Sequence, residues 1–429
     1  MVLRWHSVHS LESLIAAFYL RNTMSLSCTR WIPLFSLVLT LSGMHLHAFA
    51  QKKYDTGASD TEIRIGQTLP YSGPVSMLGN VGKVSTAYIE MVNAQGGVNG
   101  RKIKLLSLDD GYSPVKTMEQ TRKLVESDEV LFMFSSVGTA TNQVVHKYLN
   151  QKKIPQLLIL SGANKWNDPV NYPWTLSGMF SYDAEARVYV KHMLAHVKDP
   201  KIAVLSQNDE FGRDFLKGLR AALGDKANSM IVAQASYEST DPTVDSQMIA
   251  LKASGANVLM SFSNGKFTSQ SIRKAAELGW KPQLYIPLGA SSIASILQPA
   301  GLDNATGAVT IANQKNPLDP QWREDPGMKE YKEFMKRWAP TLDPNESLNL
   351  TGVTLTRLMV DVLRKCGDDL TRENVLKHML SLKDYSSNLM LPGVSITTGA
   401  QDYELYSSTR LQRFNGQSWV PFGDAFSLR

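Results

Sequence analysis

The segment FSSVGTATN, residues 134–142, lies where a short apolar run ends and a helical pattern begins. The apolar run, residues 130–134, has the length and the abrupt polar boundary of a buried strand. Small hydroxyl residues at such a strand-to-helix junction can hold a nucleophile, surround a phosphate or bind a carboxylate. Which of these uses applies depends on the fold around the junction and on the residues that flank it.

The alternation of short apolar runs with helical patterns extends along most of the chain. Strands are predicted at residues 63–66, 102–108, 130–134, 156–160, 201–206, 229–235, 258–262 and 284–287. Helices are predicted between them, then at residues 348–366 and 373–382, before closing strands at residues 411–414 and 419–422. This pattern predicts parallel sheets with helices on both faces. Because one sheet would need too many strands, we expect an α/β protein with two Rossmann-like lobes.

Composition and charge are those of a globular protein. The chain has 429 residues, enough for two or three domains, of which 43% are hydrophobic and 20% charged. The net charge of +6 is spread along the sequence, without a block of like charges or an interleaving of basic and aromatic residues. We therefore expect no nucleic acid among the partners.

The N-terminal part has the features of a secretory signal peptide, predicted over residues 1–50. Arg30 precedes a short apolar stretch, and Ala48-Phe49-Ala50 supplies a cleavage site near Ala50. A membrane anchor would need about 20 apolar residues. Met24 is an alternative start that gives a leader of ordinary length. The mature protein is expected to be exported to the periplasm and soluble, with Cys366 as its single cysteine and thus without an internal disulfide.

Catalytic and metal motifs are not found in the sequence. Neither serine of the junction has the flanking glycines of a nucleophile elbow, and the glycine-rich phosphate and dinucleotide motifs are missing as well. His146 is a candidate base for Ser135 or Ser136, against which a packed histidine is the alternative. His192 and His196 have the helical spacing of two zinc ligands but lack the glutamate of a zinc protease. We expect no enzyme, no cofactor and no metal.

The junction itself favours an anion. Ligands of open parallel sheets bind beyond the carboxyl ends of the strands. The free N–H groups of a helix's first turn attract negative charge there. Ser135, Ser136 and Thr139 add hydroxyl donors without adding charge. A carboxylate site is thus predicted, with a helix cap that binds nothing as the alternative.

Two further segments carry a family resemblance: LPYSGP at residues 69–74 and NAQGGVNGRKI at residues 93–103. With the junction and NDEFG at residues 208–212, their order resembles the type I periplasmic binding proteins, in particular the leucine/isoleucine/valine-binding branch that feeds ABC importers. The resemblance covers residues 62–429. It implies two lobes joined by a three-segment hinge, with residues 60–177 plus 290–390 in lobe one and residues 178–289 plus 391–429 in lobe two.

The resemblance also implies a binding role. The expected partners are a small carboxylate ligand in the cleft and a membrane-embedded ABC permease, and the protein is expected to be a monomer. The family's carboxylate-binding segments correspond here to Ser135, Ser136, Thr139, Ser161, Gly162, Ala163 and Asn164. Leu78 falls at the pocket for the body of the ligand.

The ammonium-binding position of the amino-acid binders departs from their pattern. An alignment on Gln270 and Arg273 places Phe267 where they have a glutamate, and Phe211 where they often have a tyrosine. A phenyl ring cannot neutralise a buried ammonium group. The resemblance therefore implies a carboxylate with an apolar or aromatic body rather than an α-amino acid.

Three alternatives remain open from the sequence. An amino-acid binder of the same fold would need another acidic partner, for which Asp183, Asp209 and Glu210 are the candidates. A ligand-sensing receptor domain would share the fold but should be tethered to a membrane or signalling segment. A hydrolase that uses Ser135 or Ser136 with His146 lacks a third orienting group.

Overall fold

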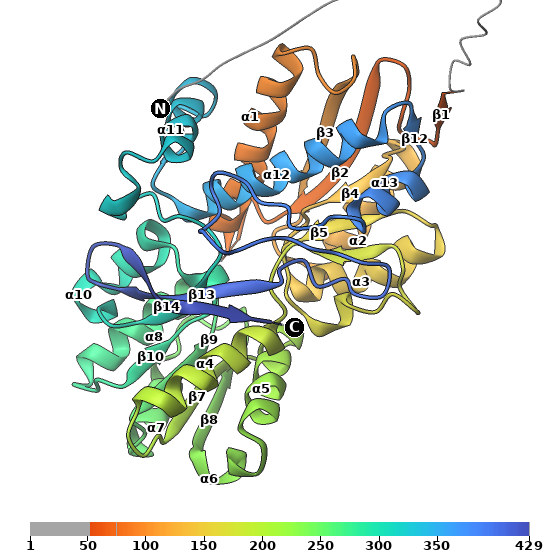
Figure 1. Cartoon of the computed structure of the whole chain (residues 1–429). Coiled ribbons are helices and arrows are strands. Elements are labelled where there is room, and N and C mark those ends of the chain that lie inside the picture. Colours follow the sequence, from red (N-terminus) through yellow and green to blue (C-terminus); the bar gives the residue numbers. More distant parts are fainter. Residues whose placement is uncertain (1–51, 74, 429) are drawn as a thin grey trace, which may run out of the picture. The chain divides into compact units, whose positions relative to one another are not determined.

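The computed structural model describes residues 52–73 and 75–428, which contain two mainly parallel sheets (Figure 1). The predicted signal peptide, with Met24 and the cleavage position near Ala50, lies outside the described residues. None of the helices in the described part is long and apolar enough to cross a membrane.

The first sheet has five parallel strands in the order β3-β2-β4-β5-β6. The strands are β2 Glu62–Leu69, β3 Lys102–Asp109, β4 Phe132–Phe134, β5 Gln156–Ile159 and β6 Thr175–Ser177. Between them lie η1 Ser76–Gly79, α1 Asn80–Ala94, α2 Pro114–Arg122, η2 Lys123–Ser127, α3 Thr139–Gln151 and η3 Asn164–Trp166. All residues of β4 and β5 are buried, as in strands that are covered on both faces.

The second sheet has seven strands in the order β14-β13-β11-β10-β9-β7-β8. They are β7 Ile202–Gln207, β8 Ile231–Tyr237, β9 Val258–Phe262, β10 Gln283–Tyr285, β11 Val309–Ala312, β13 Ser408–Phe414 and β14 Trp419–Ser427. The first five in chain order are parallel, whereas β13 and β14 are antiparallel. The helices are α4 Tyr182–His196, α5 Glu210–Leu223, η4 Gly224–Lys226, α6 Ala227–Met230, α7 Asp245–Ala253, α8 Lys266–Glu277, η5 Leu288–Ala290, η6 Ile293–Leu297, α9 Gln298–Ala300 and α10 Leu302–Ala305.

The chain crosses between the two sheets three times. It leaves the first sheet after β6, and after β11 it returns to form η7 Pro320–Trp322, α11 Pro326–Trp338, α12 Ser347–Cys366, β12 Asp369–Leu370 and α13 Arg372–Met379. Helix α12 packs on α1 of the first sheet (Figure 1), and β12 pairs with β1 Lys53–Tyr54. The third crossing leads to β13. The predicted fold class, two mainly parallel α/β lobes with a three-segment hinge, is confirmed.

The second and third crossing segments lie side by side. The Lys315 N–H donates to the Leu389 carbonyl at 3.0 Å, and the Leu391 N–H donates to the Asn313 carbonyl at 3.0 Å. These backbone bonds hold the two segments together as a short antiparallel pair. Any change in the angle between the two lobes must therefore come from a few backbone dihedrals at the ends of this antiparallel pair.

The segment 293–312 differs from the expected division of the chain, since η6, α9 and α10 pack on α8 and β11 joins the second sheet. Residues 290–390 were expected in lobe one, yet Val309–Ala312 pairs with β10 and β13 of the second sheet. Its apolar residues fit this position, since all four are buried. The rest of the proposed lobe boundaries stays a prediction.

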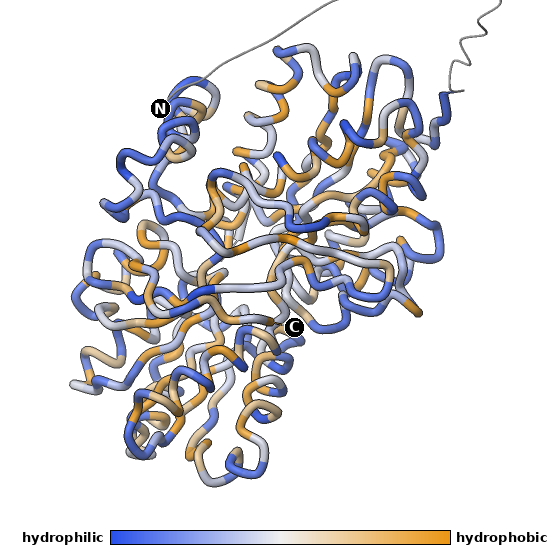
Figure 2. The backbone as a smooth tube through the Cα atoms, in the orientation of Figure 1, coloured by the Kyte–Doolittle hydropathy of each residue, from blue (hydrophilic) through white to orange (hydrophobic). Residues whose placement is uncertain are grey.

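The apolar core follows the strands. Ile65, Phe132 and Leu157 are fully buried in the first sheet, and Val204 and Met260 are fully buried in the second. Figure 2 shows hydrophilic residues (blue) mainly on the outer turns and loops. Burial of this many apolar side chains stabilises the fold at roughly 25 cal/mol per Å². Cys366, the cysteine of the described part, is a buried free thiol.

Candidate functional site

A cavity of about 120 Å³ lies where strands of both sheets end, and we call it the interlobe cavity. Its lining includes residues within two positions of the ends of four strands: Leu160 after β5, Gly178 after β6, Asn264 after β9 and Asn313 after β11. The carboxyl ends of parallel strands are where ligands of open α/β sheets bind. The two lobes and their crossing segments therefore form one candidate ligand site.

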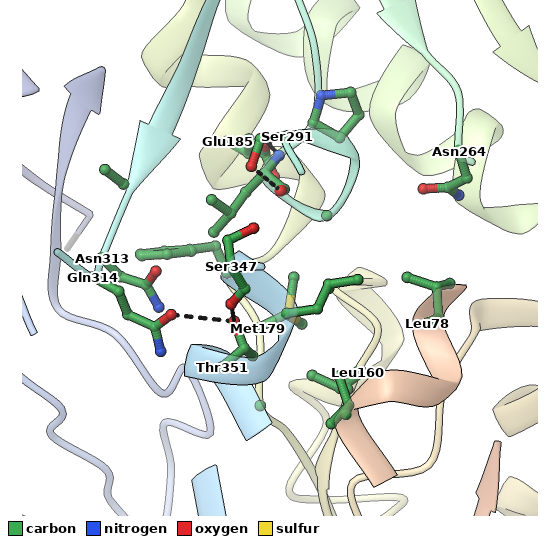
Figure 3. A pocket seen from close by; sticks show the side chains of 18 of the residues that line it. Leu78, Leu160, Met179, Glu185, Asn264, Ser291, Asn313, Gln314, Ser347 and Thr351 are labelled. Atoms are coloured by element: carbon green, nitrogen blue, oxygen red, sulfur yellow. Dashed lines mark hydrogen bonds between the residues drawn. The ribbon is translucent and has the colours of Figure 1, made fainter. Parts of the chain in front are cut away.

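The cavity has an apolar side and a polar side. Figure 3 shows Leu78 and Leu160 on one side, Gln314 and Thr351 together on another, and Glu185 at a further position in the wall. Thr351 Oγ1 donates to Gln314 Oε1 at 3.1 Å, which orients the amide. Gln314 Nε2 is buried and has no hydrogen-bond partner among the described residues. The Gln314 nitrogen is therefore covered by the cavity wall, and the oxygen of its amide is held by Thr351.

The junction at residues 134–142 reaches the cavity through Gly138 and Thr139, at the start of α3. Gly138 has φ of 102°, a left-handed conformation that glycine adopts readily. Its carbonyl accepts a bond from Asn142 Nδ2 at 2.7 Å, which holds the turn in place. Thr139 Oγ1 lies 2.7 Å from Ser161 Oγ and 3.2 Å from the Tyr182 hydroxyl. The first turn of α3 thus presents N–H groups and an ordered hydroxyl cluster beside the cavity.

The structure brings three of the ten predicted site residues to the cavity lining: Leu78, Thr139 and Phe211. Ser135 and Ser136 lie beneath it, with 0% and 3% of their surface exposed. Ser136 Oγ accepts a bond from the Thr68 N–H at 3.1 Å, so it joins β2 to the junction.

The second predicted carboxylate segment supports the lining from behind. Ser161 Oγ accepts a bond from Trp166 Nε1 at 2.9 Å, and Ala163 is buried in the core. The Asn164 N–H donates to Asp214 Oδ2 at 3.1 Å, toward α5. Gly162 packs against the backbone of Phe180, where a Cβ atom would lie 2.1 Å from the Phe180 carbonyl oxygen. These four residues position the lining and do not form part of it.

Phe267 does not reach the cavity. It is 1% exposed in the core beneath α8, where its ring lies 4.2 Å from that of Tyr237. Asn264, in the loop before α8, occupies the cavity wall instead. Because Phe267 lies outside the lining, the argument against an ammonium ligand loses its basis.

The three acidic candidates for an ammonium partner are also absent from the lining. Asp209 caps α5, accepting from the Phe211 N–H at 3.0 Å. Glu210 pairs with Lys165 and Arg213, and Asp183 pairs with Arg187 one turn along α4. All three carboxylates are thus occupied by structural partners.

Glu185 is the carboxyl group that the cavity does contain, and the sequence reasoning missed it. It lies in the first turn of α4 and is 2% exposed. Its Oε1 accepts from the Leu288 N–H at 2.7 Å and from the Tyr189 hydroxyl. Burial raises the pKa of Glu185 to about 7. In the sequence this residue resembles any glutamate at a helix start, so no local signal identified it.

Lys315 is the basic residue of the lining. Its Nζ lies 2.6 Å from Asp325 Oδ2 and 2.8 Å from the Asn388 carbonyl oxygen. Burial opposes ionisation of Asp325, but its bonds from Lys315 and the Met328 N–H outweigh this and hold its pKa below the ordinary value. The charge of Lys315 is therefore already balanced within the protein.

The geometry around His146 is that of a packed histidine. Its ring stacks on Tyr172 at 3.9 Å and meets Trp166 edge-on at 4.9 Å. Among the described residues it forms no hydrogen bond with Ser135 or Ser136, and its Nε2 has no partner. His192 Nδ1 lies 2.7 Å from the Tyr285 hydroxyl. No group of three or more potential metal-ligating side chains was found within residues 52–73 and 75–428.

The buried His146 gives a prediction for acid stability. Burial, aided by the charge of Lys165, lowers the pKa of His146 to about 4. The unfolded chain binds a proton below about pH 6.5, whereas the folded chain does not, so stability falls as the pH drops from about 7 to about 5. The unfolding free energy of His146→Phe should therefore decrease by about 2 kcal/mol less than that of the wild type between these two pH values. Urea unfolding of both proteins at each pH measures this difference. An equal loss in wild type and variant would contradict the prediction.

Two α/β lobes with a ligand-sized cavity at their facing strand ends define the class of two-lobed binding proteins. The family described as periplasmic binding protein matches residues 62–417, and the chain belongs to this family. Its fold is that of the type I periplasmic binding proteins, as the sequence resemblance predicted.

Similar proteins agree with this assignment. A Leu/Ile/Val-binding protein homolog 7 from Brucella abortus is 22% identical over 338 residues, covering 75% of this chain and 82% of the relative. A solved branched-chain amino acid ABC transporter protein from Thermus thermophilus with bound valine has a TM-score of 0.76 at 18% identity, covering 86% and 97% of the two chains. A fatty acid ABC transporter substrate-binding protein from Thermomonospora curvata has a TM-score of 0.71 at 20% identity, covering 88% and 95%. At these identities the structural likeness concerns the fold.

Proposed function

We propose that the protein is a periplasmic solute-binding protein that captures a small carboxylate with an apolar or aromatic body and delivers it to a membrane-embedded ABC permease. The observation that carries this proposal is the position of the interlobe cavity at the strand ends of both sheets. Three crossing segments connect the lobes, so a change in their angle would open or enclose a ligand. The names of the similar solved proteins, which refer to ABC transporters, support delivery to a permease.

The carboxylate would lie at the start of α3. The N–H groups of this first turn lack partners within the helix, and the helix dipole favours a negative charge beside them. Thr139 and Tyr182 border the same place with hydroxyl groups. Uncharged donors of this kind hold an anion reversibly, as a transport protein requires.

The body of the ligand would lie against the apolar wall. Leu78 and Val81 come from the first lobe, and Phe211 comes from α5 of the second. The Phe211 ring meets Tyr182 edge-on at 5.1 Å, so an aromatic surface is already fixed in the wall. Apolar contacts from both lobes would stabilise the closed form when a ligand is present.

A branched-chain or other hydrophobic amino acid is the second candidate ligand. Two observations favour it: Phe267 lies outside the lining, and Glu185 lies within it. The Brucella abortus relative is named as a Leu/Ile/Val-binding protein homolog. In neither case does the proposal include a reaction, and the ligand is expected to leave unchanged.

A thermal-shift screen of the purified protein tests the proposal. It should pair each acid with its amide, across branched-chain amino acids, aromatic acids and dicarboxylates. Binding to the folded state raises the unfolding midpoint with ligand concentration, and we expect a shift with acids that their amides do not give. Equal shifts from acid and amide would exclude the carboxylate site, and release of an altered ligand would indicate an enzyme.

The orphaned Gln314 amide gives a second prediction. Gln314→Glu places a carboxylate in the cavity wall in place of an uncharged amide, so an anionic ligand should meet a like charge there. We expect at least about a tenfold loss of affinity in isothermal titration. Gln401→Glu, at an exposed loop residue outside the lining, is the matched control. A tenfold loss in both variants would assign the effect to net charge instead.

A further inference from the structure

The two carboxylate oxygens of Glu185 have different surroundings. Oε1 accepts both protein hydrogen bonds, from the Leu288 N–H and from the Tyr189 hydroxyl. Oε2 accepts no hydrogen bond from the described residues. It is also not one of the fully buried side-chain atoms that lack a partner, so part of its surface is accessible. Since the residue is 2% exposed and lines the interlobe cavity, the accessible surface of Oε2 faces that cavity. One oxygen therefore fixes the side chain, and the other is left for an occupant.

The charges around the cavity leave this oxygen uncompensated. Glu185 is the single carboxylate and Lys315 the single lysine or arginine among the described residues of the lining. Lys315 is bonded to Asp325 at 2.6 Å and cannot serve both carboxylates from there. Tyr189, the other titratable group in contact with Glu185, reaches Oε1 only, and the Ile286 carbonyl oxygen at 2.7 Å competes for its single hydroxyl proton. A buried carboxylate with so few donors is costly unless a ligand adds one.

We propose that Glu185 determines the specificity of the interlobe cavity by accepting, through Oε2, a hydrogen bond from an N–H or O–H group of the bound carboxylate. The proposal rests on the proposed function, because it presumes a carboxylate at the start of α3. It narrows the ligand class to amino or hydroxy carboxylates. Within this class an ammonium group should bind best, because it also neutralises the buried charge.

The pKa of Glu185, raised by burial to about 7, agrees with an acceptor that lacks a partner in the free protein. An ammonium ligand would favour the ionised carboxylate and release a proton on binding near neutral pH. A plain carboxylate would favour the protonated form instead. The affinities of the two ligand types should thus change in opposite directions between about pH 6 and about pH 8.

The substitution that tests the proposal is Glu185→Gln. The glutamine keeps an oxygen for the Leu288 N–H and the Tyr189 hydroxyl, and it places an NH₂ donor where Oε2 stood. Isothermal titration should compare leucine, the hydroxy acid and the plain acid of the same carbon skeleton, and benzoate with its amino- and hydroxy-substituted forms. In the wild type we expect ligands with a donor to bind at least about tenfold tighter than the plain acid, and in the variant we expect this preference to be lost or inverted.

The controls separate this inference from the proposed function. Glu119→Gln, the same exchange at an exposed residue of α2, should keep the wild-type preference. An unchanged preference in Glu185→Gln would overturn the inference and leave the carboxylate site standing. Failure of every carboxylate to bind the wild type would overturn both. If Glu185→Gln does not fold, the wild type still supplies a test. Affinities for amino acids and for plain acids that change in the same direction with pH would overturn the inference.

Discussion

Gly162→Ala should destabilise the protein by about 3 kcal/mol and distort the interlobe cavity. A Cβ atom at this position would lie 2.1 Å from the Phe180 carbonyl oxygen and 2.8 Å from the Tyr182 ring. Phe180 lies two residues before α4 and Tyr182 begins it, and the Tyr182 N–H donates to the Gly162 carbonyl at 2.7 Å. Since the nearest atom is backbone, rotation of a side chain cannot relieve the contact.

The measurement is thermal unfolding without ligand, followed by ligand titration. With an unfolding entropy near 2.1 cal/mol/K per residue, about 3 kcal/mol corresponds to a midpoint lowered by roughly 4 °C in a chain of this size. Gly399→Ala is the control, because nothing lies within 4 Å of its Cβ position. Equal midpoints in the two variants would show that the close approach at Gly162 relaxes freely.

The fold could be predicted from the sequence because the same pattern, a short apolar strand followed by a helix, recurs along the chain. Short strands such as residues 130–134 and 258–262 are buried on both faces, so they are almost entirely apolar, with Ser261 the single polar residue of the two. Each is followed by a helix, and the spacing permits few arrangements other than parallel sheets. The strand Val309–Ala312 was assigned to the wrong lobe because pairing partners depend on contacts far apart in the chain.

The site could be predicted only where it follows directly from a strand end. Thr139 begins the helix within the junction, five residues after β4 ends, and its place at the cavity follows from that topology. Gln314 and Glu185 come from a crossing segment and from the first turn of α4, where the sequence shows ordinary polar residues. Ser135 has φ of 52° and turns beneath the surface, which residue type alone does not reveal.

Glu185→Gln should change the pH dependence of stability. Burial raises the folded-state pKa of Glu185 to about 7, above its ordinary value of 4.5. The folded chain therefore holds a proton that the unfolded chain has released, and stability falls as the pH rises through this window. The variant has no such proton, so its unfolding free energy relative to the wild type should rise by about 2.5 kcal/mol between about pH 5 and about pH 8.

Taking the difference between the two proteins cancels the buried histidines His146 and His192, whose pKa values are both lowered by burial to about 4 and whose effect on stability has the opposite sign. Urea unfolding of both proteins at matched pH supplies the difference. A flat difference would mean that Glu185 is ionised and compensated in the free protein, and Oε2 would then need no donor from a ligand. A rising difference would show that the free protein keeps a destabilising carboxyl in the cavity wall, which an ammonium ligand could compensate by favouring its ionised form.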